Sequence, residues 1–398
     1  MALVQRASEA IARMGERVAA AALTMPGLLD ALGLTEAERA LVSIDPGYST
    51  ASTASRLDSF ILPGSLQFAE YNAESPAGLG YSETLSGIFG ELDVLARFRE
   101  RFDAEPRPLM SPMLDALLAS YHEWGGAATP PTIAIVDFRG VPTWAEFEML
   151  QDRFTQSGVP TIVCDPRDLT FDGESLTALG RRIDLVYRRL LINDILDRPA
   201  DCAALVDAYT ARAVCVANTL RCKIPHKKAF FAVLTDDRFA ALFTDEERDV
   251  VAAHVPWTRL LVEGPATHDG EPVDLVPFVR AHRDNLVLKP NDEYGGTGVT
   301  LGWETEERIW DARIQDALGG TDGAWVVQEK IRVRREPFPR FEPGAGAQLG
   351  DMLVDCAPYL FRGKLAGFLT RLSASGLANV TSGGGQVPSF VVRRKRRG

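Results

Sequence analysis

The sequence predicts an α/β protein in which α+β lobes accompany a unit with a parallel sheet. The segment TIAIVDF, residues 132–138, is a β-branched run typical of a buried parallel strand. Helix and strand patterns alternate after it, as they do in βαβ units. The 398 residues are too many for one simple core, so we expect two or three domains or subdomains.

Composition and charge favour a soluble globular protein that binds neither nucleic acid nor membrane. The net charge of −11 argues against a large non-specific nucleic-acid surface. No apolar run reaches the 18 residues of a membrane span, and the N-terminus lacks the apolar core of a signal peptide. The five cysteines form no C-x-x-C pair, which indicates free thiols in a reducing compartment, so we expect a cytoplasmic location. The basic run at 393–398 is interpreted as a solvated end rather than an interaction tail.

The first part of the chain is expected to be helical and then to form a hairpin. Residues 3–42 show helical patterns with a break at 25–27, and a turn is expected at 45–50. Strand patterns at 54–62 and 66–72 flank the turn LPGS and are expected to pair with each other.

Helical patterns dominate the middle of the chain, apart from the strands of the α/β unit. Residues 82–124 are expected to be helical, with Ser82 as the N-cap of the first helix. Helices are also expected at 143–158 and across 190–222. Another should open just after Pro225, because proline is tolerated in a first helical turn.

The other predicted strands are apolar runs in both halves of the chain. They lie at residues 160–165, 183–189, 285–289, 323–331, 351–361 and 364–373. Residues 336–350 are rich in proline and glycine and are expected to form a loop. The linker GGAATPP at 125–131 helps to divide the chain into four predicted parts, at residues 1–44, 45–125, 126–220 and 221–398.

The segment NLVLKPNDEYGGTGV contains a strand, a lysine and three closely spaced glycines. Gly295, Gly296 and Gly298 would let backbone N–H groups approach phosphate oxygens, and Lys289 stands at the strand end. A hairpin with a glycine turn and a solvated lysine fits the same residues. The later run WVVQEKI could pair its backbone with an adenine edge, or it is an ordinary strand that runs into polar residues.

Glu70 and Asn72 pose a question about the second strand of the predicted hairpin. They are two residues apart, so both side chains leave the strand from the same face. Neither belongs in a dry core without a partner.

Taken together, these segments resemble the ATP-grasp enzymes. Lys228 in HKKAFF, Lys289 with its glycine loop, and QEKI occur in the order found in that family. Its usual chains carry an E-x-N pair near the C-terminus, whereas here Glu70-Tyr71-Asn72 lies near the start. This arrangement resembles the circularly permuted ATP-grasp ligases, namely glutathionylspermidine synthetase and the eukaryotic-type glutathione synthetases.

The resemblance covers residues 45–75 and 183–390, and it includes an R-x-D motif at Arg56 and Asp58. The chain lacks the cysteine amidase domain of bacterial glutathionylspermidine synthetase. Ser373 stands where glutathione synthetases carry a lysine. The chain is therefore more similar to the uncharacterised stand-alone members of the family, and a polyamine or glutathione substrate does not follow.

The resemblance implies a role for each candidate residue. Asp58, Glu70, Asn72 and Glu293 would hold Mg²⁺, a cation that prefers oxygen ligands; a polar exposed face of a hairpin is the simpler alternative. Arg56 would face the transferred phosphoryl group, Arg189 and Arg371 would contact the substrate, and residues 379–388 would form a lid. The residues implied to bind ATP are Lys228, Lys289, Gly295, Gly296, Gly298, Gln328, Glu329, Ile331 and Asp355. Surface salt bridges remain an alternative for the arginines, and a plain strand-end acid for Asp355.

The implied fold is a permuted ATP-grasp in which residues 45–125 carry the metal ligands and 126–220 form the substrate domain. The implied activity is Mg²⁺- and ATP-dependent ligation of a small-molecule or peptide carboxylate to an amine, through an acyl phosphate and with release of ADP. Two alternatives stay open: a small-molecule kinase that grips ATP in the same way, and a non-catalytic nucleotide-binding protein.

Overall fold

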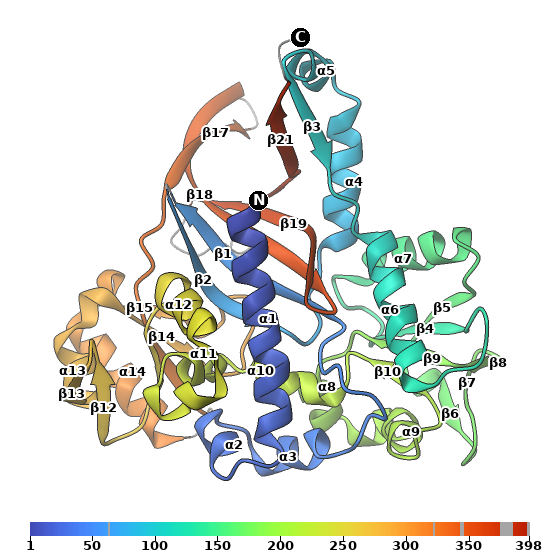
Figure 1. The fold of residues 1–398 in the computed structure, drawn as a ribbon, viewed down its shortest axis with the longest axis horizontal. Helices are drawn as coiled ribbons and strands as arrows, with labels where there is room; N and C mark the ends of the chain where they lie inside the picture. Colours follow the sequence, from blue (N-terminus) through green and yellow to red (C-terminus); the bar gives the residue numbers. More distant parts are fainter. Residues whose placement is uncertain (63, 321–322, 343–345, 375–384, 396–398) are drawn as a thin grey trace.

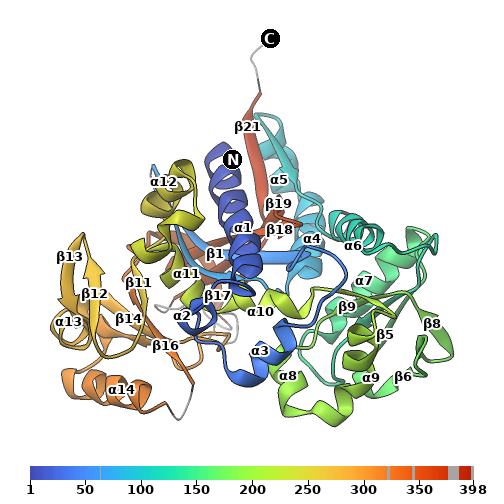
Figure 2. The same cartoon turned by 60° about the horizontal axis from the view of Figure 1, so that its bottom comes forward.

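The computed structural model of the chain describes residues 1–62, 64–320, 323–342, 346–374 and 385–395. A central antiparallel sheet separates a unit with a parallel sheet from a lobe built on a second antiparallel sheet (Figure 1 and Figure 2). This mixture of helices and sheets confirms the predicted α/β class. Of the helices in the described part of the chain, none is both long enough and apolar enough for a membrane span.

Three N-terminal helices form the first part of the structure. They are α1 (Ala2–Ala22), α2 (Leu28–Ala31) and α3 (Glu36–Val42), and the predicted break between the first two is confirmed. The buried face of α1 packs on the hairpin of residues 54–72 and on the two long strands near the C-terminus. A capping box begins α3. The Thr35 hydroxyl accepts from the Glu38 N–H, and the Glu38 carboxylate accepts from the Thr35 N–H.

The central sheet joins a hairpin from near the start of the chain to strands from near its end. Its order is β2-β1-β18-β19-β20, and β17 pairs with β18. The bounds are β1 Ala54–Leu62, β2 Ser65–Asn72, β17 Arg335–Glu342, β18 Gly346–Phe361, β19 Lys364–Ser373 and β20 Gly385–Val387. The predicted pairing of the first two strands is confirmed. The loop expected at 336–350 is wrong: prolines 337 and 339 suit the edge strand β17, where a missing N–H costs no ladder bond.

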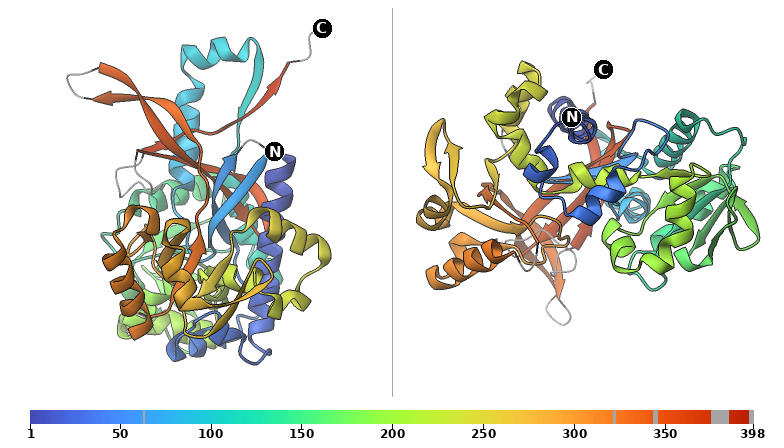
Figure 3. Two further views of the ribbon diagram at one scale, coloured as in Figure 1. Left: turned by 90° about the vertical axis from the view of Figure 1, so that its left-hand side faces the viewer. Right: turned by 90° about the horizontal axis from the view of Figure 1, so that it is seen from below.

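An arm projects from the body of the protein (Figure 3). It consists of α4 (Leu79–Gly90), α5 (Asp93–Arg99), β3 (Phe102–Pro106) and β21 (Phe390–Arg394). The expectation of helix throughout 82–124 fails at β3, because this strand forms only by pairing with the distant β21. Ser82 is not an N-cap, since α4 begins after Gly78. Helix α6 (Met110–Trp124) returns the chain to the body.

The parallel sheet has the order β10-β9-β4-β5. Its strands are β4 (Ile133–Val136), β5 (Thr161–Cys164), β9 (Leu185–Arg188) and β10 (Cys215–Ala217), and helices α7 (Trp144–Gln156), α8 (Ile192–Asp197) and α9 (Pro199–Thr210) connect them. Three short strands, β6 (Leu169–Phe171), β7 (Leu176–Ala178) and β8 (Arg181–Ile183), form a separate small sheet. The prediction of helix across 190–222 missed β10, whose three residues are too few to show a strand period.

The third region holds the second antiparallel sheet, in the order β11-β16-β14-β15. Its strands are β11 (Thr258–Leu260), β14 (Leu286–Pro290), β15 (Thr300–Leu301) and β16 (Trp325–Glu329). Strands β12 (Pro265–His268) and β13 (Glu271–Asp274) form a separate ribbon. The helices are α10 (Lys223–His226), α11 (Ala229–Leu234), α12 (Asp245–His254), α13 (Leu275–Ala281) and α14 (Glu307–Gly319). The helix expected after Pro225 is α11, which begins at Ala229, and Pro225 itself lies inside the short helix α10 before it.

Candidate active site

Four of the predicted residues meet on the first hairpin of the central sheet. In the register of β1 and β2, Asp58 lies opposite Glu70 and Arg56 lies opposite Asn72. Because side chains alternate along a strand, all four leave from one face of the hairpin. A shift of register follows Asp58, and such irregularities often re-aim a side chain beside a functional site.

Asp58 is held between two arginines. Its Oδ1 lies 3.1 Å from Arg56 Nε, and its Oδ2 lies 2.6 Å from a terminal nitrogen of Arg371. Burial alone would raise the pKa of Asp58, but the guanidinium groups of Arg371 and Arg56 outweigh it and hold that pKa well below its usual range. Asp58 is therefore a carboxylate at every physiological pH.

Asp355 stands on the other side of Arg371. Its Oδ2 accepts from Arg371 Nε at 2.7 Å, and its Oδ1 accepts from the Ser59 N–H at 3.0 Å. Burial raises the pKa of Asp355 to about 7 in spite of the neighbouring guanidinium. Asp355 is fully buried with both oxygens bonded, so a contact with a ribose would require Arg371 to move.

Glu70 marks the point where the central sheet meets the third region. Asn72 Nδ2 donates to Glu70 Oε1 at 3.1 Å, and Lys228 Nζ lies 3.5 Å from Glu70 Oε2. Lys228 also donates to the carbonyl of Glu293, at the start of the glycine loop. The Glu293 side chain itself is exposed, so the structure brings its backbone but not its carboxylate to this cluster.

Lys289 reaches the same place from β14. Its Nζ donates to Gln328 Oε1 at 2.6 Å and to the carbonyl of Ala69 at 3.3 Å. Burial lowers the pKa of Lys289 to about 8, with Glu70 as the nearest compensating charge. Gln328 is fixed from its other end, since its Nε2 donates to Thr258 Oγ1 at 3.0 Å.

The glycine loop connects the antiparallel strands β14 and β15, so its backbone forms a hairpin connection. Gly295, Gly296 and Gly298 all have positive φ, which L side chains rarely adopt. A Cβ at Gly298 would lie 2.6 Å from the Pro290 ring, so this position also requires glycine for space.

The predicted adenine segment lies at the end of β16. The Glu329 N–H donates to the carbonyl of Trp257 at 2.9 Å, and the Glu329 side-chain Oε1 lies 2.8 Å from His268 Nε2. Ile331 follows two residues after the strand and is half-buried. The predicted lid, 379–388, falls largely outside the described residues.

Arg189 lies in the unit with the parallel sheet, directly after β9. It is buried; it donates to the carbonyl of Pro76 at 3.0 Å and to the Tyr187 hydroxyl at 3.1 Å, and its Nε has no partner. Asp137 directly follows the neighbouring strand β4, and burial raises its pKa to about 6. The connection after β4 leads to β5 at one edge of the sheet, whereas the connection after β9 leads to β10 at the other edge. The strand order therefore reverses between β4 and β9, and ligands of α/β folds bind at such a switch point. The sequence reasoning missed Asp137, although its place after a buried strand could have shown it.

A second set of missed residues forms a buried ion network behind the cluster. Glu74 lies 3.2 Å from Arg188 and 3.5 Å from Lys223, and Lys223 Nζ lies 2.7 Å from Asp292. Lys227 connects Asp292, at 3.1 Å, to Glu38 of α3 at 2.6 Å. The network thus ties the hairpin end, the parallel-sheet unit, the N-terminal helices and the glycine loop together. Residue types alone gave no signal for it, because its members are far apart in the sequence.

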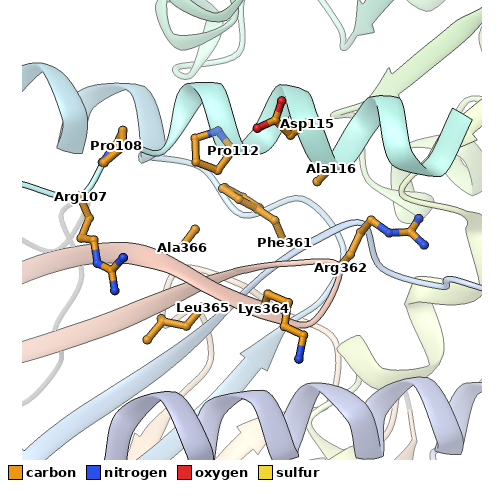
Figure 4. Close-up of a pocket in the computed structure, with 10 residues that line it drawn as sticks. All are labelled: Arg107, Pro108, Pro112, Asp115, Ala116, Phe361, Arg362, Lys364, Leu365 and Ala366. Carbon is orange, nitrogen blue, oxygen red and sulfur yellow. The ribbon is translucent and has the colours of Figure 1, made fainter. Parts of the chain in front are cut away.

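A hollow of about 420 Å³ between α6 and the turn from β18 to β19 lies outside this site (Figure 4). None of its lining residues belongs to the clusters above. Two of its cations already have acidic partners, since Arg362 lies 2.5 Å from Glu123 and Lys364 lies 3.3 Å from Glu9. We assign it no part in the chemistry.

The whole fold is similar to a solved structure. A glutathione synthetase-like effector of Globodera pallida superposes with a TM-score of 0.59 over 97% of this chain and 85% of that one, at 12% identity. The chain therefore shares the fold of that effector. No family model matches the chain.

Two curated proteins resemble the chain in sequence. Proteins of Frankia alni and Frankia casuarinae that carry the name glutamate–cysteine ligase are 26% and 25% identical to it, over 306 and 309 residues. The match covers 71% of this chain but 32% of each relative, so the chain spans about a third of the length of the curated relatives it matches.

Proposed function

We propose that the chain is an ATP-dependent, ADP-forming ligase that joins a carboxylate to an amine. The observation that carries the proposal is the convergence of Lys228 and Lys289, from the third region, on Glu70 and Asn72 of the central sheet. Two ammonium groups beside a carboxylate and an amide suit a polyphosphate and its metal ion. The ligase names of the sequence relatives support the same reaction class.

The circularly permuted order is part of this proposal. In the central sheet β1 pairs with β18, so the E-x-N pair on β2 lies one strand away from a long strand near the chain's end. That placement supports the idea that Glu70 and Asn72 do the work of an E-x-N pair that ordinary ATP-grasp chains carry near the C-terminus.

The donor set fits Mg²⁺. Asp58, Glu70 and Asn72 offer carboxylate and amide oxygens on adjacent strands, the hard ligands that this ion prefers. The described residues include no group of three His, Cys, Asp or Glu side chains that could hold a metal. The asparagine amide and substrate phosphates would therefore complete the coordination, as is usual for magnesium, with Glu293 joining if its loop turns inward. When bound, the ion would neutralise charge on the phosphates.

The remaining residues take roles around the phosphates and the nucleotide. Lys228, Lys289 and the N–H groups of Gly295, Gly296 and Gly298 would bind ATP phosphates, and the segment Gln328, Glu329 and Ile331 would border the adenine. Asp355 would contact the ribose only if Arg371, which now donates to its carboxylate, moved away. Arg56 donates to the Ala77 carbonyl at 2.7 Å and to Asp58, which fixes its guanidinium beside the proposed metal ligands.

The reaction is proposed to run in two displacements. An oxygen of the substrate carboxylate takes the γ-phosphoryl group of ATP, which gives an acyl phosphate and ADP. The amine then attacks the acyl carbon, the C–O bond to phosphate breaks, and the amine loses a proton. Arg56 and Arg371 would offset the charge on the phosphoryl group and the carboxylate, so the protein mainly positions and neutralises.

The substrate would extend towards the parallel sheet. Arg189 and Asp137 stand at the switch point with opposite charges, so they suit a substrate that has a carboxylate and an ammonium group at that end. An amino acid or small peptide meets this requirement. The test is a screen of amino acids, peptides and polyamines for ADP release: release that requires both a carboxylate and an amine is expected, and release with a lone hydroxyl compound would contradict the proposal.

Binding of ATP is expected to raise the melting temperature, and Mg²⁺ should enlarge the effect. A ligand that binds only the folded chain stabilises it by about 2.7 kcal/mol at a hundred times its dissociation constant. Differential scanning fluorimetry with ATP, with and without Mg²⁺, measures this. An unchanged melting temperature with saturating Mg²⁺–ATP would remove the basis for a nucleotide site.

The affinity for ATP is expected to fall as the pH rises above about 8, the pKa of the half-buried Lys289. Phosphate oxygens favour the ammonium form, so above that pKa binding must take up a proton, and affinity should fall by up to about tenfold per pH unit. Below pH 7 the lysine is already charged and no dependence is expected from it. Calorimetric titrations from pH 7 to pH 9.5 should show the slope in the natural chain, whereas Lys289→Arg should flatten it. An identical slope in this variant would exclude Lys289 as its source.

A further inference from the structure

The projecting arm carries apolar side chains that nothing in the described chain covers well. Five large apolar residues within 88–98 are more than a third exposed: Ile88, Phe89, Leu92, Val94 and Phe98. Val94 reaches 69% and Ile88 55%, and α5 contains no buried residue. Contiguous apolar surface of this kind marks an interaction site.

The strands of the arm belong to no larger sheet in the described chain. Strands β3 and β21 form a sheet of two strands that is joined to no other sheet. The ribbon packs against α4 and α5, and Ala104 of β3 is fully buried there, so the outer face of α5 is the side of the arm left to solvent. Figure 3 shows the arm standing clear of the body, which leaves room for a large partner to approach it.

The charges on α5 indicate which partner fits. Asp93 and Arg97 are four residues apart, as are Val94 and Phe98, so at 100° per residue the two pairs form neighbouring stripes on one exposed face. The acid lies in the first turn and the base in the last. This pattern is complementary to its own copy turned end for end.

We infer that α4 and α5 form a two-fold interface with a second copy of this chain. In an antiparallel pairing of α5 with α5, Val94 and Phe98 of the two copies pack together. Asp93 of each copy then faces Arg97 of the other, because a two-fold axis repeats each contact twice. The interface lies outside the proposed ligase site, so the inference does not depend on the reaction.

Sedimentation velocity and light scattering over a range of protein concentration test the interface. The natural chain is expected to be a dimer at micromolar concentration, and Val94→Glu is expected to be a monomer with an unchanged circular dichroism spectrum, since this side chain is exposed. The matched control is Val262→Glu, which places the same change at an exposed valine of the third region, 51% exposed, and should leave the dimer intact. A natural chain that stays monomeric, or a dimer that Val94→Glu does not weaken, overturns the inference.

Charge reversal identifies the antiparallel pairing itself. Asp93→Lys alone and Arg97→Glu alone each place like charges opposite one another twice, and each should weaken the dimer by roughly tenfold or more. An equimolar mixture of the two variants restores both opposite-charge contacts in a mixed dimer. Recovery of dimer in the mixture supports the pairing, and a mixture no tighter than the separate variants overturns it.

Discussion

Replacing Glu70 by glutamine is expected to lower turnover by roughly a thousandfold, because the metal supplies several kcal/mol of charge stabilisation and each 1.36 kcal/mol is tenfold in rate. Glutamine keeps the size of the side chain but removes the negative charge that Mg²⁺ would bind. Glu70 is half-buried, and its polar contacts are with Asn72 and Lys228, so the fold should persist.

ADP release with an active pair of substrates measures this effect, and circular dichroism checks the fold. The matched control is Glu271→Gln, the same change at an exposed strand residue of the third region, which should keep full activity. A second measurement needs no substrate. In Glu70→Gln, Mg²⁺ should no longer add to the rise in melting temperature that ATP causes. Near-normal turnover together with a normal effect of Mg²⁺ would show that Glu70 is not a metal ligand.

Replacing Arg188 by leucine is expected to cost about 3–5 kcal/mol of stability, since it leaves a buried carboxylate without its cation. Arg188 is fully buried and donates to Glu74 at 3.2 Å, to the Asn218 carbonyl at 3.2 Å and to the Leu190 carbonyl at 2.5 Å. Lys223 remains near Glu74 at 3.5 Å but cannot replace these bonds.

Urea unfolding followed by fluorescence measures that loss. Arg182→Leu serves as the control, because its side chain is 70% exposed and its nearest acid is 3.8 Å away, so the cost should stay below about 1 kcal/mol. The double variant Arg188→Leu with Glu74→Gln should recover part of the loss, because no unpaired charge is then buried. Equal stability of Arg188→Leu and Arg182→Leu would mean that the buried network does not hold the parts together.

Much of the fold follows from local pattern. The run at 133–136 is apolar throughout and became the buried strand β4, and the two strands around LPGS became the pair β1 and β2. The failures share a cause: β3, β10 and β17 are short or proline-containing segments that become strands only through a partner far away in the sequence. No local period reports such pairing.

The candidate site likewise contains residues whose meeting local pattern could predict and residues whose meeting it could not. Arg56, Asp58, Glu70 and Asn72 could be found together because two residues on one strand share a face and the adjacent hairpin strand lies opposite. The ion network around Glu74 could not, because its assembly depends on how the parallel sheet and the third region pack against the hairpin. The burial that raises the pKa of Asp355 and lowers that of Lys289 is likewise a property of the packed molecule.

Trapping with hydroxylamine tests the ligase proposal most directly. With Mg²⁺–ATP and the correct carboxylate, an acyl phosphate formed in the site would react with this small amine and give a hydroxamate, with ADP and phosphate. Arg56→Ala should suppress the hydroxamate, because this guanidinium would offset charge on the phosphoryl group in flight. The account predicts a hydroxamate in amounts equal to the ADP released; ADP with a stable phosphate ester on a hydroxyl group would contradict it and identify a kinase.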